Sequence, residues 1–349
     1  MSGLPLLGKR PCPGDVPSSV DDCLEQAGGW GFFQWRLLFT LGMCTAMVAA
    51  HMLQPIFLAP LIHWPLSPWC RGAVSSAFFL GYGVGVFFWA CVSDKRGRRP
   101  TIILSFAIGN LAGILSFLAP NYSVFFLLRL VCGFGVSGTK NAVFLLGTEF
   151  CPPSARAKLA GMLAYSWLAG LLVLIATARV LRGASWRYLG LVHAPGLLLQ
   201  LGLRAQRELP ESPRFLLVAG EVERAKEVLF RVFVANGKVP PEPLCLQQPP
   251  PKGNEQSAFS QLFSARMRPA TFAIGICQAV CTMTFYAITF SEQLNRTVGD
   301  LYLGALLGAT IELPAYILLA PFTDRFGRQM SAHYFSCSAD FWYPAIPHL

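Results

Sequence analysis

The feature that most constrains this chain is a series of long apolar stretches without a single Asp, Glu, Lys or Arg. A helix needs about 20 apolar residues to cross the hydrocarbon core of a bilayer, and a soluble domain does not bury several such stretches. Their presence predicts transmembrane helices joined by polar loops. The five stretches cover residues 37–62, 72–93, 101–119, 159–178 and 269–291.

Three further apolar stretches each contain a polar or charged residue. Such side chains usually face the interior of a helical bundle, so these stretches are also predicted to span the membrane. The composition agrees, since only 13% of the residues are charged, against about 25% in soluble domains. The predicted fold class is an all-α membrane protein with about eight transmembrane helices. The three stretches are residues 122–148 with Arg129 and Lys140, residues 188–203 with His193, and residues 301–322 with Glu312.

The basic residues are distributed unevenly between the two sides of these spans. Lys and Arg beside spans are retained on the cytoplasmic side of a membrane. With the N-terminus in the cytoplasm, most of the 28 Lys and Arg residues fall on that side. The chain is therefore predicted to begin in the cytoplasm. The outer side would then hold only these arginines: Arg71, Arg129, Arg179, Arg182, Arg187 and Arg296.

The net charge of +10 does not indicate a nucleic-acid partner, because the basic residues lie beside apolar runs rather than among aromatic residues on one face. They are predicted to face anionic lipid. The 11 cysteines show no CxxC pair and no metal spacing, so neither a metal nor a cofactor is expected. An enzyme is not expected either, since no nucleophile with a base and no phosphate-binding loop is evident. Residues 1–22 lack the apolar core of a signal peptide, so insertion is expected to depend on the first span.

A short charged motif occurs twice, each time directly after an apolar run. Two copies at equivalent places in two halves indicate duplication of a six-helix unit. The first copy reads Asp94-Lys95-Arg96-Gly97-Arg98-Arg99, and the second reads Asp324-Arg325-Phe326-Gly327-Arg328-Gln329.

The spans and the repeat divide the chain into segments. Within the long basic loop, Ser212 and Pro213 are typical of a helix start, and the apolar residues after them predict an amphipathic helix under the bundle. A proline-rich run at residues 240–251 ends this helix. The predicted segments are a cytoplasmic N-terminus (1–36), a six-helix half (37–203), a cytoplasmic central loop (204–268), two helices of a second half (269–322), and a cytoplasmic tail that begins with the second motif copy (323–349).

The two motif copies and the long central loop resemble the major facilitator superfamily. Further similarity is to its solute carrier 22 branch, the transporters of organic cations, anions and zwitterions. That similarity lies in the acidic start at residues 21–28, Thr148-Glu149-Phe150, Glu211-Ser212-Pro213-Arg214 and Glu312-Leu313-Pro314. The resemblance implies a major facilitator-type bundle. Because the family has twelve spans and eight are predicted here, the chain resembles a shortened member of the branch.

The resemblance also implies a gate on the cytoplasmic side. In the superfamily the motif residues bridge helix ends, and this ion-pair network breaks and re-forms as the two halves rock. The second copy would meet the start of the fifth span near Glu149, Arg156 and Lys158. The first copy would need an eleventh helix, so normal locking of the outward-facing state is not expected. The alternative is that the basic residues only anchor the chain. The implied gating residues are Asp94, Gly97, Arg98, Arg99, Glu149, Arg156, Glu211, Arg214, Asp324, Gly327 and Arg328.

Lys140 is the residue that we expect to meet a substrate. An unpaired ammonium in the bilayer costs at least about 2.5 kcal/mol, so a lysine within a span normally faces a wet cavity and an acidic partner. Glu312 is the only carboxylate within the predicted spans, which suggests a Lys140–Glu312 pair. The alternatives are that Lys140 extends to the membrane surface and that Glu312 bonds a neighbouring helix beside Pro314.

Aromatic residues in three spans are, by resemblance, further candidates for the wall of a central cavity. Flat apolar faces with a few polar groups suit amphiphilic organic ions. For each residue taken separately, plain helix packing is the simpler explanation. The candidates are Phe144, Tyr165, Trp167, Phe285 and Tyr286.

The function implied is secondary transport of organic ions or related small amphiphilic solutes by alternating access. The alternatives are a receptor-like or regulatory membrane protein that does not transport, and a non-productive truncated splice form. The expected location is the plasma membrane, with intracellular retention as the alternative for a short form. The expected partners are the lipid bilayer and a small organic ion, and the oligomeric state stays open.

Overall fold

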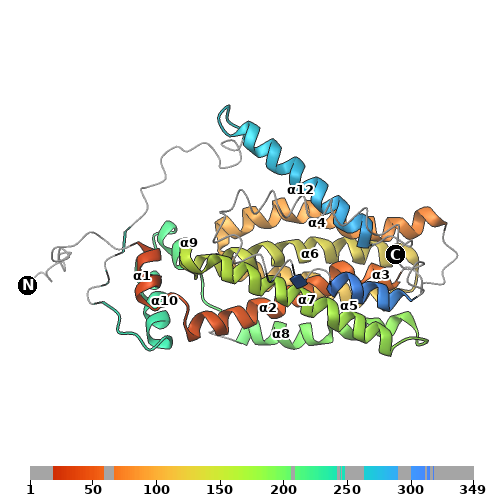
Figure 1. Ribbon diagram of the computed structural model, residues 1–349, viewed down its shortest axis with the longest axis horizontal. Helices are drawn as coiled ribbons and strands as arrows, with labels where there is room; N and C mark the ends of the chain where they lie inside the picture. Colours follow the sequence, from red (N-terminus) through yellow and green to blue (C-terminus); the bar gives the residue numbers. More distant parts are fainter. Residues whose placement is uncertain are drawn as a thin grey trace, which may run out of the picture.

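The computed structural model describes residues 19–58, 67–205, 209–241, 244, 246–247, 263–289, 300–310, 313–314 and 317. Most of this part of the chain is helical (Figure 1). Within it, five stretches are long and apolar enough to cross a membrane: Phe32–Leu58, Gly72–Arg96, Arg98–Ser116, Tyr122–Glu149 and Pro153–Val180. The helices predicted at residues 37–62, 72–93, 101–119, 122–148 and 159–178 are therefore confirmed, with two exceptions. Residues 59–62 lie outside the described residues, and residues 117–119 follow the end of the helix Arg98–Ser116.

Local sequence sets where these helices begin. Ser67 caps α4 (Pro68–Arg96), and the Asn121 side chain accepts a 3.0 Å hydrogen bond from the Val124 amide at the start of α6 (Tyr122–Glu149). α5 (Arg98–Ser116) follows α4 after the single residue Gly97, whose φ of +99° favours glycine.

α6 is the centre of the bundle. It packs along α4 and α5, while α2 (Phe32–Leu53), which continues into α3 (Pro55–Leu58), packs along α7 (Arg156–Val180). The short helix η1 (Pro153–Ala155) leads into α7. Gly81 of α4 lies so close to α6 that an added Cβ would overlap the backbone of Leu130, and Gly133 of α6 meets the backbone of Phe78 in the same way. Small residues thus let these helices approach closely, as is common in membranes.

The later predicted spans differ in form. The sixth begins as a 3-10 helix, η2 (Trp186–His193), and continues as α8 (Ala194–Ala205). Pro195, which lacks a backbone N–H, occupies the first turn of α8, where an α-helix tolerates it. The seventh is α12 (Arg268–Thr289), and the eighth is described as the helix Leu301–Thr310. The total of eight spans stays a prediction.

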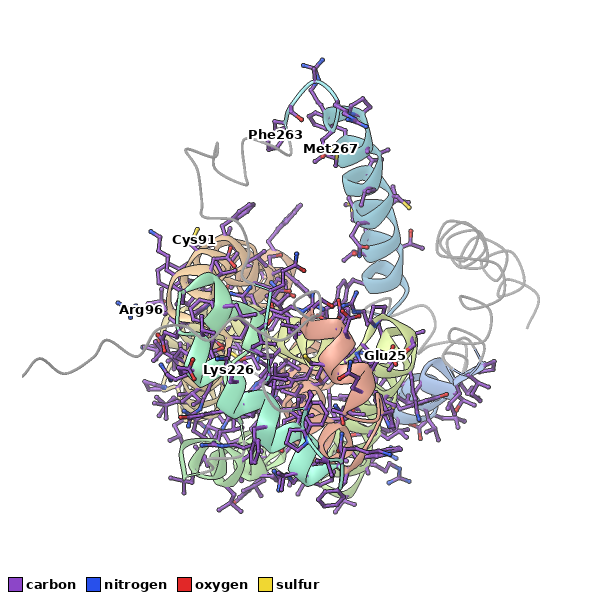
Figure 2. All side chains as sticks on the ribbon, turned by 90° about the vertical axis from the view of Figure 1, so that its left-hand side faces the viewer. Glu25, Cys91, Arg96, Lys226, Phe263 and Met267 are labelled. Atoms are coloured by element: carbon purple, nitrogen blue, oxygen red, sulfur yellow. The ribbon has the colours of Figure 1, made fainter. Side chains whose placement is uncertain are left out.

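Three short helices cover one end of the bundle, which we name the motif end because it carries the first copy of the charged motif (Figures 1 and 2). α9 begins at Pro213, and the Ser212 side chain accepts a 3.2 Å hydrogen bond from the Phe215 amide, which confirms the predicted helix start. The predicted single helix is instead two, because Gly220 adopts a φ of +81° between them. The three helices are α1 (Val20–Gln26), α9 (Pro213–Val218) and α10 (Val222–Ala235).

A capping box stabilises the N-terminus of α1. The Asp22 amide donates to the Ser19 hydroxyl at 3.1 Å, and the Ser19 amide donates back to Asp22 at 3.0 Å. The hydrogen bonds from the Ser19 side chain and backbone lower the pKa of Asp22. The next residue of α1, Cys23, is fully buried, and burial raises the pKa of its thiol to about 11. Cys23 therefore acts as a small apolar core residue.

α12 leans away from the rest of the bundle. Near one end, the ring centroids of Tyr286 and Phe79 lie 4.7 Å apart, and the Tyr286 hydroxyl lies 3.9 Å from the sulfur of Met52. The other end, near Phe263 and Met267, stands away from the bundle (Figure 2). α12 thus contacts α2 and α4 at one end and diverges from them toward the motif end.

Candidate functional site

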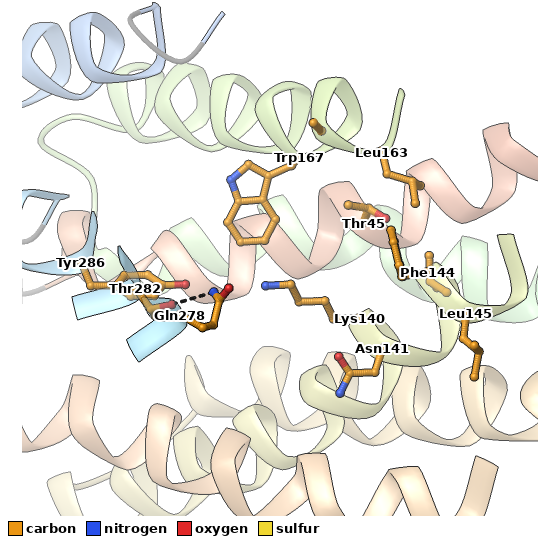
Figure 3. A pocket seen from close by; sticks show the side chains of 12 residues that line it. Thr45, Lys140, Asn141, Phe144, Leu145, Leu163, Trp167, Gln278, Thr282 and Tyr286 are labelled. Atoms are coloured by element: carbon orange, nitrogen blue, oxygen red, sulfur yellow. Dashed lines mark hydrogen bonds between the residues drawn. The ribbon is translucent and has the colours of Figure 1, made fainter. Parts of the chain in front are cut away.

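A cavity of about 730 Å³ lies between α12 and a wall formed by α2, α6 and α7 (Figure 3). Small-molecule sites typically occupy about 300–1,000 Å³ and have mostly apolar walls with a few polar groups. Among the described residues that line this cavity, Lys140 alone carries a charge. The lining residues are Thr45, Lys140, Asn141, Val143, Phe144, Leu145, Leu163, Ala164, Trp167, Gln278, Thr282 and Tyr286.

The Lys140 ammonium contacts aromatic faces. Its nitrogen lies 5.1 Å from the ring centroid of Trp167 on α7 and 5.9 Å from that of Tyr82 on α4. Such cation–π contacts are worth about 0.5–2 kcal/mol. Within the described part of the chain, Lys140 forms no hydrogen bond and no ion pair. Its charge is thus held at the cavity wall by rings that offer no compensating negative charge.

The opposite wall is supplied by α12. The side chains of Gln278 and Lys140 point toward one another across the cavity (Figure 3). The Gln278 amide nitrogen donates a 3.1 Å hydrogen bond to the Thr282 hydroxyl, which fixes the orientation of the amide. Asn141 follows Lys140 on α6 and adds a second amide to the lining. These groups can hydrogen-bond a polar ligand from more than one side.

The structure brings several of the predicted substrate residues together. Lys140, Phe144, Trp167 and Tyr286 all line the cavity. Tyr165 is 41% exposed and does not belong to the lining. Phe285 belongs to α12, but its side chain lies outside what the structure describes, as does the whole of Glu312. A Lys140–Glu312 pair therefore stays a hypothesis.

The first copy of the charged motif forms an ion-pair network at the motif end. Arg98 lies 3.2 Å from Glu149 at the end of α6 and 3.5 Å from Asp94 on α4. Its guanidinium also donates to the Ser93 carbonyl at 2.9 Å and lies over the ring of Phe215. Arg98 thus joins three helices and the central loop.

Glu211 of the central loop caps α5. One of its carboxylate oxygens accepts a 2.8 Å hydrogen bond from the Arg98 amide, and the Arg99 amide donates to the same carboxylate at 3.3 Å. A carboxylate at this position satisfies free N–H groups and complements the positive end of the helix dipole. A Cβ at Gly97 would overlap the carboxylate, so glycine is needed there for space as well as for its φ.

Asp21 of α1 forms ion pairs with two arginines that were predicted to belong to the cytoplasmic gate. Arg156 at the start of α7 lies 3.1 Å from Asp21, and Arg214 of α9 pairs with the same carboxylate oxygen. Lys158 lies over the rings of Trp30 and Trp35, at 4.6 and 5.6 Å. The expected contacts of Asp324, Gly327 and Arg328 lie outside the described residues.

Sequence reasoning missed a buried polar cluster around Arg129. This arginine, which the charge distribution places with the arginines of the outer side, is fully buried. It donates to the Gln54 side chain at 2.8 Å and to the His51 carbonyl at 3.0 Å. Gln54 in turn contacts His193 at 2.9 Å, and the rings of His51 and His193 stack at 3.8 Å. Polar residues inside three apolar runs were the available signal, but the sequence does not show that they meet.

Within the described residues, no group of three His, Cys, Asp or Glu side chains could hold a metal ion. Four of the described cysteines, Cys23, Cys44, Cys132 and Cys151, are buried, while Cys91 and Cys277 are exposed. Burial raises the pKa of the Cys151 thiol to about 12.

Comparison with known families identifies the type of protein. Residues 65–339 match the family described as "Sugar (and other) transporter". The chain belongs to this family. Its fold is the major facilitator type, since the proton:xylose symporter XylE, solved with a bromo-deoxyglucose, superposes with a TM-score of 0.62 over 85% of this chain and 70% of XylE. The two sequences are 17% identical, so that likeness shows the fold alone.

Two relatives illustrate the names found among similar proteins. The synaptic vesicle 2-related protein of Xenopus laevis is 34% identical over 82% of this chain and 52% of its own length. The organic cation/carnitine transporter 4 of Arabidopsis thaliana is 30% identical over 76% of this chain and 52% of its own length. The chain thus spans about half the length of these curated relatives. It is a multi-pass membrane protein of this family, and the solute carrier 22 branch stays a prediction.

Proposed function

We propose that this family member carries small organic ions or related amphiphilic solutes across a membrane by alternating access. The observation that carries the proposal is the cavity between α12 and the α2, α6 and α7 wall, with a charged group against aromatic faces. Transporters of this architecture bind substrate between two repeats that rock against one another.

The network at the motif end supports the rocking step. Arg98 links α4, α6 and the central loop through Glu149 and Glu211, and Asp21 links α1 to α7 and α9. These contacts lie at helix ends, where they can break and re-form without disrupting helix interiors. With the N-terminus in the cytoplasm, the motif end is the cytoplasmic face, which fits its excess of Arg and Lys.

The substrate class is supported by a similarity and by the chemistry of the wall. One relative is named an organic cation/carnitine transporter, in agreement with the solute carrier 22 resemblance. The lining offers the rings of Phe144, Trp167 and Tyr286 for a flat apolar body. A plasma-membrane location is part of this proposal.

Uptake into liposomes tests the proposal. The purified chain, reconstituted into liposomes, is expected to take up at least one member of a panel of labelled organic cations and anions with saturable kinetics. Ala164→Trp, which fills the cavity, should reduce that uptake at least tenfold. Ala169→Trp places the same bulk on an exposed face of α7 and should leave uptake unchanged. No uptake by a folded, correctly inserted wild-type chain would overturn the proposal.

A further inference from the structure

The cavity has an unbalanced charge. Lys140 contributes one positive charge, and no Asp or Glu is among the described residues that line the cavity. Its amine lies over two rings and forms no hydrogen bond or ion pair within the described part of the chain. The Lys140 side chain is exposed where it lines the cavity, so its charge is accessible to a ligand there. An incoming anion would supply the missing partner.

We propose that the ligand of this cavity is a compact aromatic anion whose charged group pairs with Lys140, which makes Lys140 the residue that selects the sign of the substrate's charge. The inference rests on the proposed function and narrows it from organic ions to anions. An ammonium paired with a carboxylate or sulfonate forms a charge-assisted hydrogen bond, which is stronger than a neutral one.

An organic cation fits the same cavity poorly. A cation in such a wall would bind over the faces of aromatic rings. The Lys140 amine already lies over the rings of Trp167 and Tyr82, at 5.1 and 5.9 Å from their centroids, so a cation bound over these rings would lie close to a like charge. A second positive charge there would also be repelled by the Lys140 ammonium. The Lys140 ammonium therefore disfavours a cation at this wall.

The position of an anion follows from the surrounding side chains. Lys140 and Gln278 point toward one another from opposite walls, so a charged group between them would meet the ammonium on one side and an amide on the other (Figure 3). The apolar part would then lie against Trp167, Phe144 and Tyr286. A flat ring fits between such walls better than a bulky aliphatic group.

Binding of a matched ligand series tests this inference without requiring transport. The labelled probes are 2-naphthalenesulfonate, 2-naphthol and 2-naphthyltrimethylammonium, which share one ring system and differ in charge. Equilibrium binding is measured on the purified chain in detergent. We expect the sulfonate to bind at least tenfold more tightly than the cation, with the neutral naphthol between them.

Two variants assign this preference to Lys140. Lys140→Gln should remove the preference for the sulfonate, and Lys140→Arg should retain most of it. Lys158→Gln is the matched control, because Lys158 also lies over aromatic rings but outside the cavity, and it should change nothing. Thermal unfolding of each variant establishes that it is folded.

Several outcomes would overturn the inference. They are equal or tighter binding of the cation, an unchanged preference in Lys140→Gln, and no binding of the sulfonate to a folded wild-type chain. A preference that appears only in Glu312→Gln would also overturn it, since Glu312 would then already neutralise Lys140. Saturable uptake of a cation or a neutral solute into liposomes would support the proposed transport function but contradict the inference that the substrate is an anion. If the sulfonate binds but no solute is taken up, the anion site is supported and the proposed transport function is contradicted.

Discussion

Arg129 and Lys140 are cations on the same helix, eleven residues or about 16 Å apart, yet their surroundings are opposite. Arg129 is fully buried and donates to the Gln54 side chain and the His51 carbonyl. Lys140 opens onto a cavity, where its amine lies over two aromatic rings and forms no hydrogen bond or ion pair within the described chain.

This difference separates a charge that stabilises the fold from a charge that is available to bind a ligand. A buried guanidinium with acceptors in place stabilises the fold, because its removal leaves those acceptors without donors. An ammonium without polar partners contributes little to the fold and remains available to a ligand. Burial and partners, rather than charge alone, therefore indicate which role a membrane lysine or arginine has.

The largest expected effect is on Arg129. Arg129→Met should lower the free energy of unfolding by about 3 kcal/mol, because the Gln54 and His51 oxygens lose their donors inside the bundle. Lys140→Met should change it by less than about 0.5 kcal/mol, because no polar partner is lost. Detergent-denaturation titrations of the two purified variants measure both values. Equal losses of stability in the two variants would contradict the different roles assigned to Arg129 and Lys140.

The packing that seals the Arg129 region can be tested at α4. Gly81→Ala should cost about 2 kcal/mol, since the added methyl overlaps the backbone of Leu130, the neighbour of Arg129. Gly83 on the same helix has no atom within 4 Å of an added Cβ, so Gly83→Ala should be neutral or slightly stabilising. The difference between the two melting temperatures measures the close approach of α4 and α6. Identical melting temperatures would mean that this approach is not tight.

Arg98 is an intermediate case, with partners but some exposure. Its side chain is 13% exposed and pairs with Glu149, which is 10% exposed. Arg98→Gln should therefore cost about 1.5 kcal/mol. Arg96→Gln removes a neighbouring exposed charge of the same motif and should cost less than about 0.5 kcal/mol. The same denaturation titration ranks the two, and a larger loss in Arg96→Gln would contradict the assignment.

The smallest effect is expected at Asp21. Its carboxylate and the two arginines it pairs with are about one-third exposed, so Asp21→Asn should cost less than about 1 kcal/mol. Raising the salt concentration to 0.5 M should reduce the difference further, because exposed ion pairs are screened. Melting temperatures at low and high salt measure this dependence. If Asp21→Asn lowered the free energy of unfolding as much as Arg129→Met does, the burial of a charged side chain would not determine its contribution to stability.

The sequence predicts the spans better than the site. The lengths of the apolar runs were enough to place five helices, because the bilayer sets that length. Lys140 could be singled out because a charge inside a span is rare. The Arg129 cluster was beyond sequence reasoning, because His51, Gln54 and His193 meet only after helices far apart in the chain pack together. The capping of α5 by Glu211 depends in the same way on a contact between distant segments.

One measurement tests the division of roles most directly: thermal unfolding of the wild type, Arg129→Met and Lys140→Met with and without 2-naphthalenesulfonate. A ligand that binds only the folded state raises its melting temperature. We predict that Arg129→Met melts well below the wild type, and that Lys140→Met melts with the wild type but no longer responds to the sulfonate. A Lys140→Met chain that is stabilised by the sulfonate as much as the wild type would contradict the account.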